Sequence, residues 1–146
     1  MPESIGISIC ERVLQDVFRR DAMTLVNVHN GISSHAFPTL VPVLYAFAQL
    51  RRSPNAFTYQ FKVLDQSKNE VSNSGIGKVD ALDNPNAVHK VISAFSGLIF
   101  QGPGNYSFVL EIDGKAIDSI PFIVEESVAM QADASTNQNT EVLSQT

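Results

Sequence analysis

The chain has 146 residues, close to the size of one domain, and carries 10 Lys and Arg against 15 Asp and Glu, a net charge of −5. With 44% hydrophobic and 17% charged residues it is too apolar for a disordered chain, and no apolar run approaches the ~20 residues that span a bilayer. The acidic balance and the scattered basic residues argue against nucleic acid as a partner. We therefore expect a folded domain that binds neither nucleic acid nor membrane.

Two features bear on the cellular compartment. The first residues contain neither the basic nor the apolar region of a signal peptide. Cys10 is the single cysteine, which excludes an internal disulfide and a multi-cysteine metal site. Both observations lead us to expect a cytoplasmic protein.

In chain order, the first three predicted strands are 5–14, 23–28 and 43–50. In the first, isoleucines alternate with small or polar residues, a period of two that places them on one face. The second follows the polar turn Arg19-Arg20-Asp21. The third is apolar on both faces, which is typical of a central, covered strand.

The clearest alternation lies in 57–63 and 106–112, where aromatic and aliphatic residues occupy every second position. Asp113-Gly114 follows the second of these and predicts a tight hairpin turn into a partner strand, 116–124. Pro121 cannot donate a ladder hydrogen bond, so we expect it at an edge or a bulge.

The remaining segments give weaker signals. Residues 65–70 read as a polar loop, and 75–79 as a short strand weakened by two glycines. Residues 87–95 fit both helical and strand spacing. The β-branched residues there favour a strand, and a helix stays open as the alternative.

The composition changes after Glu126. Residues 127–146 contain no aromatic residue, Gly, Pro, Lys or Arg, and are rich in small polar residues. Such a segment cannot bury enough apolar surface to offset its ordering entropy. We therefore predict a domain over 1–126 and a flexible, disordered polar tail over 127–146.

Many short strands and almost no helix predict an all-β fold, an antiparallel immunoglobulin-like β-sandwich of about seven to eight strands. A true immunoglobulin domain would bring a Cys…Trp…Cys core, whereas this chain has one Cys and no Trp. "Immunoglobulin-like" therefore describes the architecture only.

A family resemblance rests on the order of these segments. Its motifs are the opening 9–16 and 24–28, the Ala36-Phe37-Pro38 crossover, 44–50, the Pro-Gly-x-Tyr turn within 100–108, and the closing 120–124. In these the chain resembles a family of small, uncharacterised bacterial proteins of unknown function that look like a single β-sandwich domain, over residues 5–125. The resemblance supports the fold and transfers no catalytic residue.

Residues that could carry chemistry do not form a recognisable set. His29 and His35, with Asp21 or Asp83, could in principle bind a divalent metal, but their spacing matches no standard motif. Cys10 lacks a nucleophile signature. The Asp- and Asn-rich stretch 80–86 lacks the spacing of a calcium loop and is better explained as a turn. We expect no catalytic residue, metal site or cofactor.

The connection 33–42 is the best candidate for binding, because loops at sandwich ends commonly carry it. Its candidate residues are His35, Phe37, Pro38, Leu40 and Pro42, although Phe37 and Leu40 could instead plug the core. We expect a non-enzymatic module that acts through protein–protein contacts. The alternatives are a structural homo-oligomer and, less favoured, a metal-dependent hydrolase using loop histidines. We do not expect a small-molecule ligand, and the absence of Trp disfavours carbohydrate binding.

Overall fold

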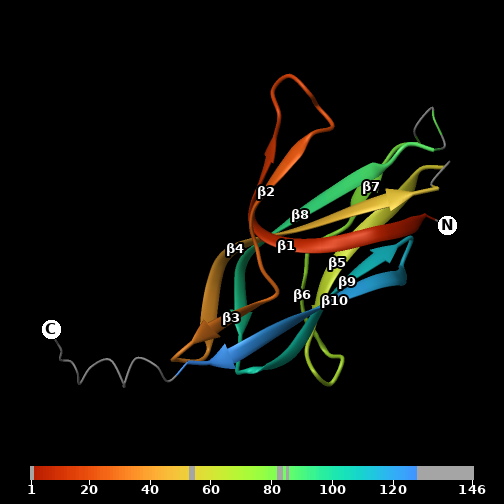
Figure 1. Ribbon diagram of the computed structural model, residues 1–146. Coiled ribbons are helices and arrows are strands. Elements are labelled where there is room, and N and C mark those ends of the chain that lie inside the picture. The colour runs from red at the N-terminus through yellow and green to blue at the C-terminus, as the bar shows by residue number, and fades with distance from the viewer. Residues whose placement is uncertain (1, 53–54, 82–83, 85, 128–146) are drawn as a thin grey trace, which may run out of the picture.

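The computed structural model describes residues 2–52, 55–81, 84 and 86–127. Within them ten strands form two sheets, with no helix (Figure 1). The strands are β1 (Glu3–Gln15), β2 (Met23–Val28), β3 (Gly31–Ser34), β4 (Thr39–Arg51), β5 (Phe57–Leu64), β6 (Glu70–Asn73), β7 (Gly77–Val79), β8 (His89–Phe100), β9 (Gly104–Ile112) and β10 (Lys115–Glu126).

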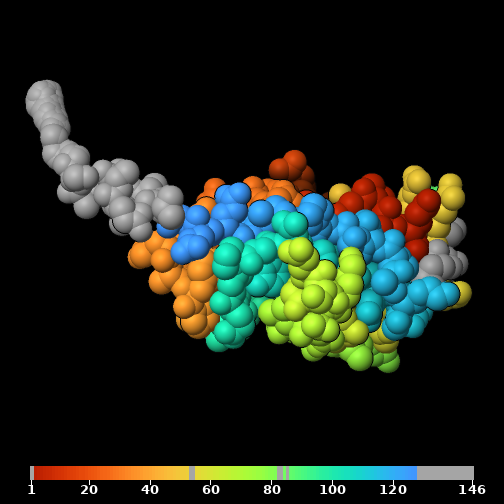
Figure 2. Space-filling model, turned by 90° about the horizontal axis from the view of Figure 1, so that it is seen from below, coloured from red at the N-terminus to blue at the C-terminus, as the bar shows by residue number. Residues whose placement is uncertain are grey.

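The two sheets pack face to face as a sandwich. One has the strand order β2-β1-β4-β8, and the other β3-β10-β9-β5-β6, with β7 also pairing with β5. All pairs are antiparallel except β3 with β10, which run parallel. Figure 2 shows β9 and β10 beside each other on one face of the molecule. The prediction of an all-β sandwich is confirmed. The part of the chain described contains no helix able to cross a membrane.

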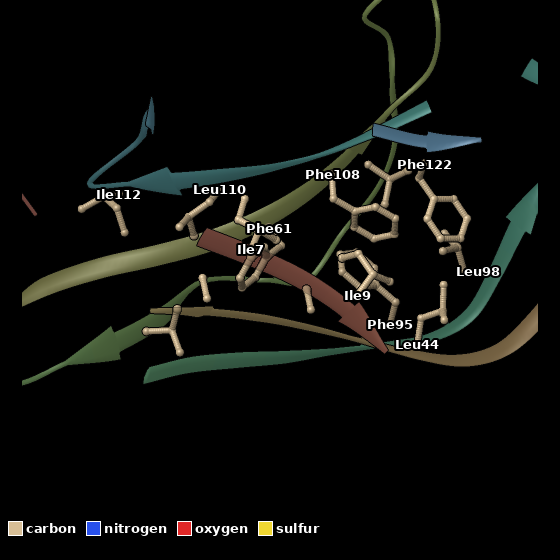
Figure 3. Packing of buried hydrophobic residues seen from close by; sticks show 14 of the residues in the cluster. Ile7, Ile9, Leu44, Phe61, Phe95, Leu98, Phe108, Leu110, Ile112 and Phe122 are labelled. Atoms are coloured by element: carbon tan, nitrogen blue, oxygen red, sulfur yellow. The ribbon is translucent and has the colours of Figure 1, made fainter. Parts of the chain in front are cut away.

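The core lies between the inner faces of the sheets (Figure 3). Ile9 from β1 and Leu44 from β4 meet aromatic side chains from the opposite sheet. Phe108, fully buried on β9, has its ring centroid 5.4 Å from that of Phe95 and 5.2 Å from that of Phe122, both edge to face. Because side chains alternate across a strand, long strands such as β5 and β9 contribute every second residue to this layer.

Several local predictions are confirmed. The segments with clear alternation are β5 and β9, and the segment left between helix and strand belongs to β8. Asp113 (φ 50°) and Gly114 (φ 81°) both have positive φ and separate the paired residues Ile112 and Lys115, as a type I′ turn requires. Pro121 of β10 pairs with Ser107 of β9 on one side. The pairing of β10 with β3 on the other side begins only at Ile123, so the missing N–H of Pro121 breaks no hydrogen bond to β3.

Other local predictions differ from the structure. The short strands β3 and β6 were not expected, because four residues carry too little alternation to be recognised. The expected loop 33–42 is a loop only between Ser34 and Thr39, since β4 begins four residues earlier than predicted. Within the predicted tail only Ser127 is described, and residues 128–146 lie outside the described part of the chain.

Partway along β4 and β8, the residues that point to the core switch from one face of each strand to the other. This switch obscured the start of β4 in the sequence. The two strands keep one continuous register, in which Pro42 stands opposite Gly97. On one side of this point the inward residues include Leu44 and Phe95; on the other they are Val41, Leu98 and Phe100. Gly97 has a φ of +67°, a conformation that side chains disfavour. This bend turns Leu40 and Ile99, which face each other across the pair, out to solvent.

Candidate functional site

The first candidate site is a fork in the four-stranded sheet. β1 pairs with β4 as far as Cys10 opposite Tyr45. Beyond that point residues 11–15 of β1 pair with β2, while residues 39–44 of β4 pair with β8. The two strand pairs therefore separate, and Figure 1 shows the β1–β2 pair leaving the body of the sandwich.

A pocket of about 410 Å³ lies in this fork. Its wall is mostly apolar, with Glu11 and Arg12 on the β1 side; the remaining lining residues are His29, Ile32 and Val41 to Leu44. Its size and character suit an apolar group, because ligand sites of this kind combine apolar walls with few polar atoms. We call it the fork pocket.

His29 supplies the polar atom of this pocket that lacks a partner. Its Nδ1 lies 3.0 Å from the carbonyl oxygen of Gly31, and because a carbonyl can only accept, Nδ1 carries the hydrogen. In the neutral ring Nε2 is then an acceptor. It is buried without a hydrogen-bond partner among the described residues. A buried acceptor left unpaired is costly.

The second feature is the arm, which we define as residues 11–28, the β1–β2 hairpin beyond the fork. Its tip is held by Asp16, whose Oδ1 accepts hydrogen bonds of 2.8 Å from the N–H groups of Phe18 and Arg19. Asp16 also pairs with the Arg19 guanidinium at 3.1 Å. The N–H groups of Arg19 and Phe18 hold the pKa of Asp16 below its ordinary value. These hydrogen bonds and this ion pair thus fix the conformation of the tip.

This loop presents apolar side chains to solvent. Phe18 is 94% exposed and Val17 is 85% exposed. Both lie between the predicted strand 5–14 and the predicted polar turn Arg19-Arg20-Asp21, where the sequence analysis assigned no element. The missed signal was the pair of large apolar residues directly before the arginines.

The residues predicted to bind are not brought together. Pro42 lines the fork pocket, whereas Phe37 is half-buried and packs against the core. His35, Pro38 and Leu40 are exposed, and Leu40 pairs with Ile99 on the outer surface. The predicted connection therefore contributes to the pocket through its last two residues, Val41 and Pro42.

The residues considered for chemistry also lie apart. No three His, Cys, Asp or Glu side chains gather as a metal ion would require in the part of the chain described. His89 is buried, with Nε2 3.1 Å from the Asp80 carbonyl oxygen. Cys10 is fully buried, and burial raises the pKa of its thiol. The two acidic residues of the fork and tip, Glu11 and Asp16, accept hydrogen bonds from Asn27 and from backbone groups.

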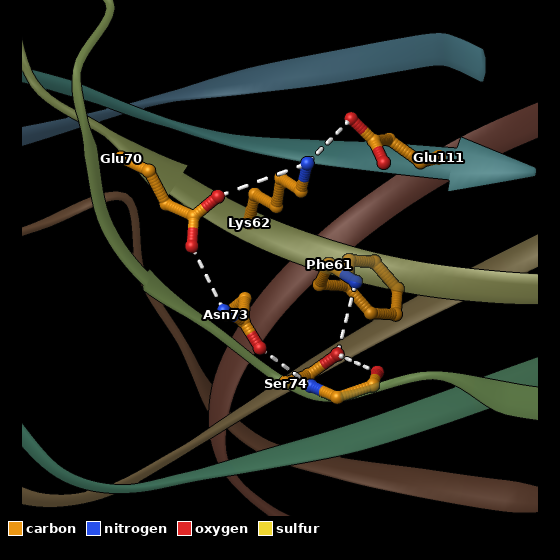
Figure 4. A network of polar contacts seen from close by, with 7 residues as sticks. Phe61, Lys62, Glu70, Asn73, Ser74 and Glu111 are labelled. Atoms are coloured by element: carbon orange, nitrogen blue, oxygen red, sulfur yellow. Dashed lines mark hydrogen bonds and ion pairs between the residues drawn. The ribbon is translucent and has the colours of Figure 1, made fainter. Parts of the chain in front are cut away.

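A polar network on the outer face of the second sheet is structural in character (Figure 4). Lys62 on β5 lies 3.1 Å from Glu111 on β9 and 3.7 Å from Glu70 on β6. The hydrogen bond to Glu111 raises the pKa of Lys62. Opposite charges on neighbouring strands stabilise a sheet, and the network needs no other role.

Comparison with known proteins places the chain in a family. Residues 6–125 match a family described as a family of unknown function (DUF6941). The chain belongs to this family. No curated protein matches its sequence. Among solved structures it is similar to an alkylpurine DNA glycosylase, AlkC, of Pseudomonas fluorescens bound to DNA containing an abasic site analog, with a TM-score of 0.43 and 10% identity. That match covers 65% of this chain and 27% of the glycosylase, too distant to bear on function.

Proposed function

We propose that the protein is a non-enzymatic binding module that acts through protein–protein contacts, with the arm as its contact element. The observation that carries the proposal is the exposure of Phe18 on a loop fixed by hydrogen bonds. Buried aromatic side chains dominate the energy of protein interfaces. An anchor already held in place loses little entropy on binding, which favours association.

The exposed apolar surface of the arm, and the low stability expected for an uncovered hairpin, support the same proposal. A two-stranded hairpin without a covering layer is marginal in water. Here Leu14 and Val28 are about half exposed as well as Val17 and Phe18 at the tip, so the arm displays apolar surface along its length. A partner that covers this surface would stabilise the arm. Cys10, the single cysteine of the chain, forms no disulfide, which is consistent with a protein that acts in the reducing cytoplasm.

Photo-crosslinking tests this function. A photoreactive phenylalanine analogue replaces Phe18 in the full chain, expressed in the native host and illuminated. The matched control places the same analogue at Ile76, which is 72% exposed between β6 and β7. We expect an adduct of defined mass from position 18 that excess unlabelled protein suppresses, and none from position 76. No adduct at position 18, or the same adducts at both positions, would refute the proposal.

A further inference from the structure

We propose that Phe18 at the tip of the arm of one copy fills the fork pocket of a second copy of this chain. This inference rests on the proposed function, because it names the partner of the arm. The chain supplies both halves of the contact: an aromatic side chain that is 94% exposed, and a pocket of about 410 Å³ with apolar walls from β4.

The arm cannot fill the pocket of its own chain. The pocket lies at the base of the arm, where Glu11 and Arg12 leave the sheet. Gln15 is five residues past Cys10 in a paired, extended strand, which carries the tip about 16 Å away from that base. Folding Phe18 back would break the β1–β2 pairing. A second copy can supply it while both hairpins stay intact.

The charges at the tip of the arm are mixed. Arg19 and Arg20 directly follow Phe18, but Arg19 is paired with Asp16 at 3.1 Å and Asp21 follows Arg20, so Arg20 is the tip cation without an ion pair in the described part of the chain. Glu11 lines the fork pocket, and exposed Glu125 lines an adjoining groove that shares Ile32 with it. Arg20 on an arriving arm would meet these carboxylates beside the pocket, while Arg12 on the pocket wall would face the acidic Asp21 of the tip.

The contact uses a different surface on each partner, so it is heterologous. Because each copy carries one arm and one pocket, two copies can exchange arms in a closed two-fold dimer, or further copies can add until a larger ring closes or a filament forms. Variants that each lack one of the two surfaces give the inference a sharp test.

The test is sedimentation velocity of the full chain at concentrations from about 10 μM to about 1 mM. This is the range in which a weak contact becomes occupied. We expect the sedimentation coefficient of the wild type to rise with concentration as a dimer or larger species form. Phe18→Asp removes the anchor and Val43→Arg blocks the pocket, and each should weaken association at least tenfold. Mixed in equal amounts, the two variants should form a heterodimer and nothing larger, because one retains the pocket and the other the arm. Leu40→Arg, on the same strand but outside the pocket, should associate as the wild type does.

Circular dichroism melts establish that each variant is folded before the comparison. A wild-type chain that stays monomeric throughout, or a folded pair of variants that stays monomeric when mixed, would overturn the inference. If position 18 nevertheless crosslinks a different protein in the host, the proposed function stands and the second copy is the wrong partner.

Discussion

Phe108→Ala tests whether the two sheets are held together by the aromatic layer. The side chain is fully buried on β9 and meets Phe95 from the facing sheet and Phe122 from its own. Truncating a core Phe to Ala costs about 3–5 kcal/mol. Each edge-to-face pair is worth about 0.5–1.5 kcal/mol beyond area burial. Because two such pairs are lost, we expect the upper end of that range, about 4–5 kcal/mol.

The assay is urea unfolding followed by far-UV circular dichroism. A domain of this size has a free energy of unfolding of about 5–15 kcal/mol, so the variant should fold and have a lower midpoint with an unchanged slope. Ile76→Ala is the matched control, since the side chain is 72% exposed and its loss should cost less than about 0.5 kcal/mol. A loss below about 2 kcal/mol for Phe108→Ala, at unchanged slope, would refute this account of the core.

Three further predictions concern single positions. Gly97→Ala should lower the free energy of unfolding by about 1 kcal/mol in the same assay, because an added Cβ meets only ordinary contact with Leu40 at 3.9 Å and the strain comes from a φ of +67°. Cys10 should not react with a thiol reagent at about pH 8 until urea unfolds the chain, since burial shields the thiol and raises its pKa. The amide NMR signals of Phe18 and Arg19 should titrate with a midpoint below pH 3.8, the ordinary pKa of Asp16. The pKa of Asp16 is lowered, so its hold on the tip is complete above that value and is lost as the pH falls through the lowered pKa.

Each of these has an outcome that contradicts it. Gly97→Ala as stable as the wild type would mean that the bend in β8 does not depend on the left-handed conformation. Rapid labelling of Cys10 in the folded chain would mean that β1 opens readily. Tip amides that titrate above pH 3.8 would show that Asp16 is not the group that holds the loop.

Sequence patterns determined the elements whose signal is local. Alternation over 57–63 and 106–112 specified β5 and β9, because a period of two separates the faces of any strand wherever it lies. Asp113-Gly114 specified its hairpin turn, since two positive φ angles suit few residue pairs. In 87–95 both spacings fit, and the β-branched residues favoured the strand that the structure has from His89 onward.

The candidate site depended on pairing between distant segments. The first four residues of β4 looked like a loop because the apolar residues of the strand change face at Pro42, opposite Gly97 on the neighbouring strand. A switch in which residues of a strand point inward can be recognised only when the neighbouring strand, which bends at the same level, is known. Phe18 was likewise visible in the sequence, but exposure is a property of what packs around a side chain.

The sequence by itself thus established an all-β chain with its main strands and one hairpin turn. The tertiary structure alone decided that β1 parts from β4 at Cys10, which creates the fork pocket and sends the arm away from the sandwich. The physical reason is that strand conformation follows from neighbouring residues, whereas the end of a ladder is set by competition among strands remote in the chain.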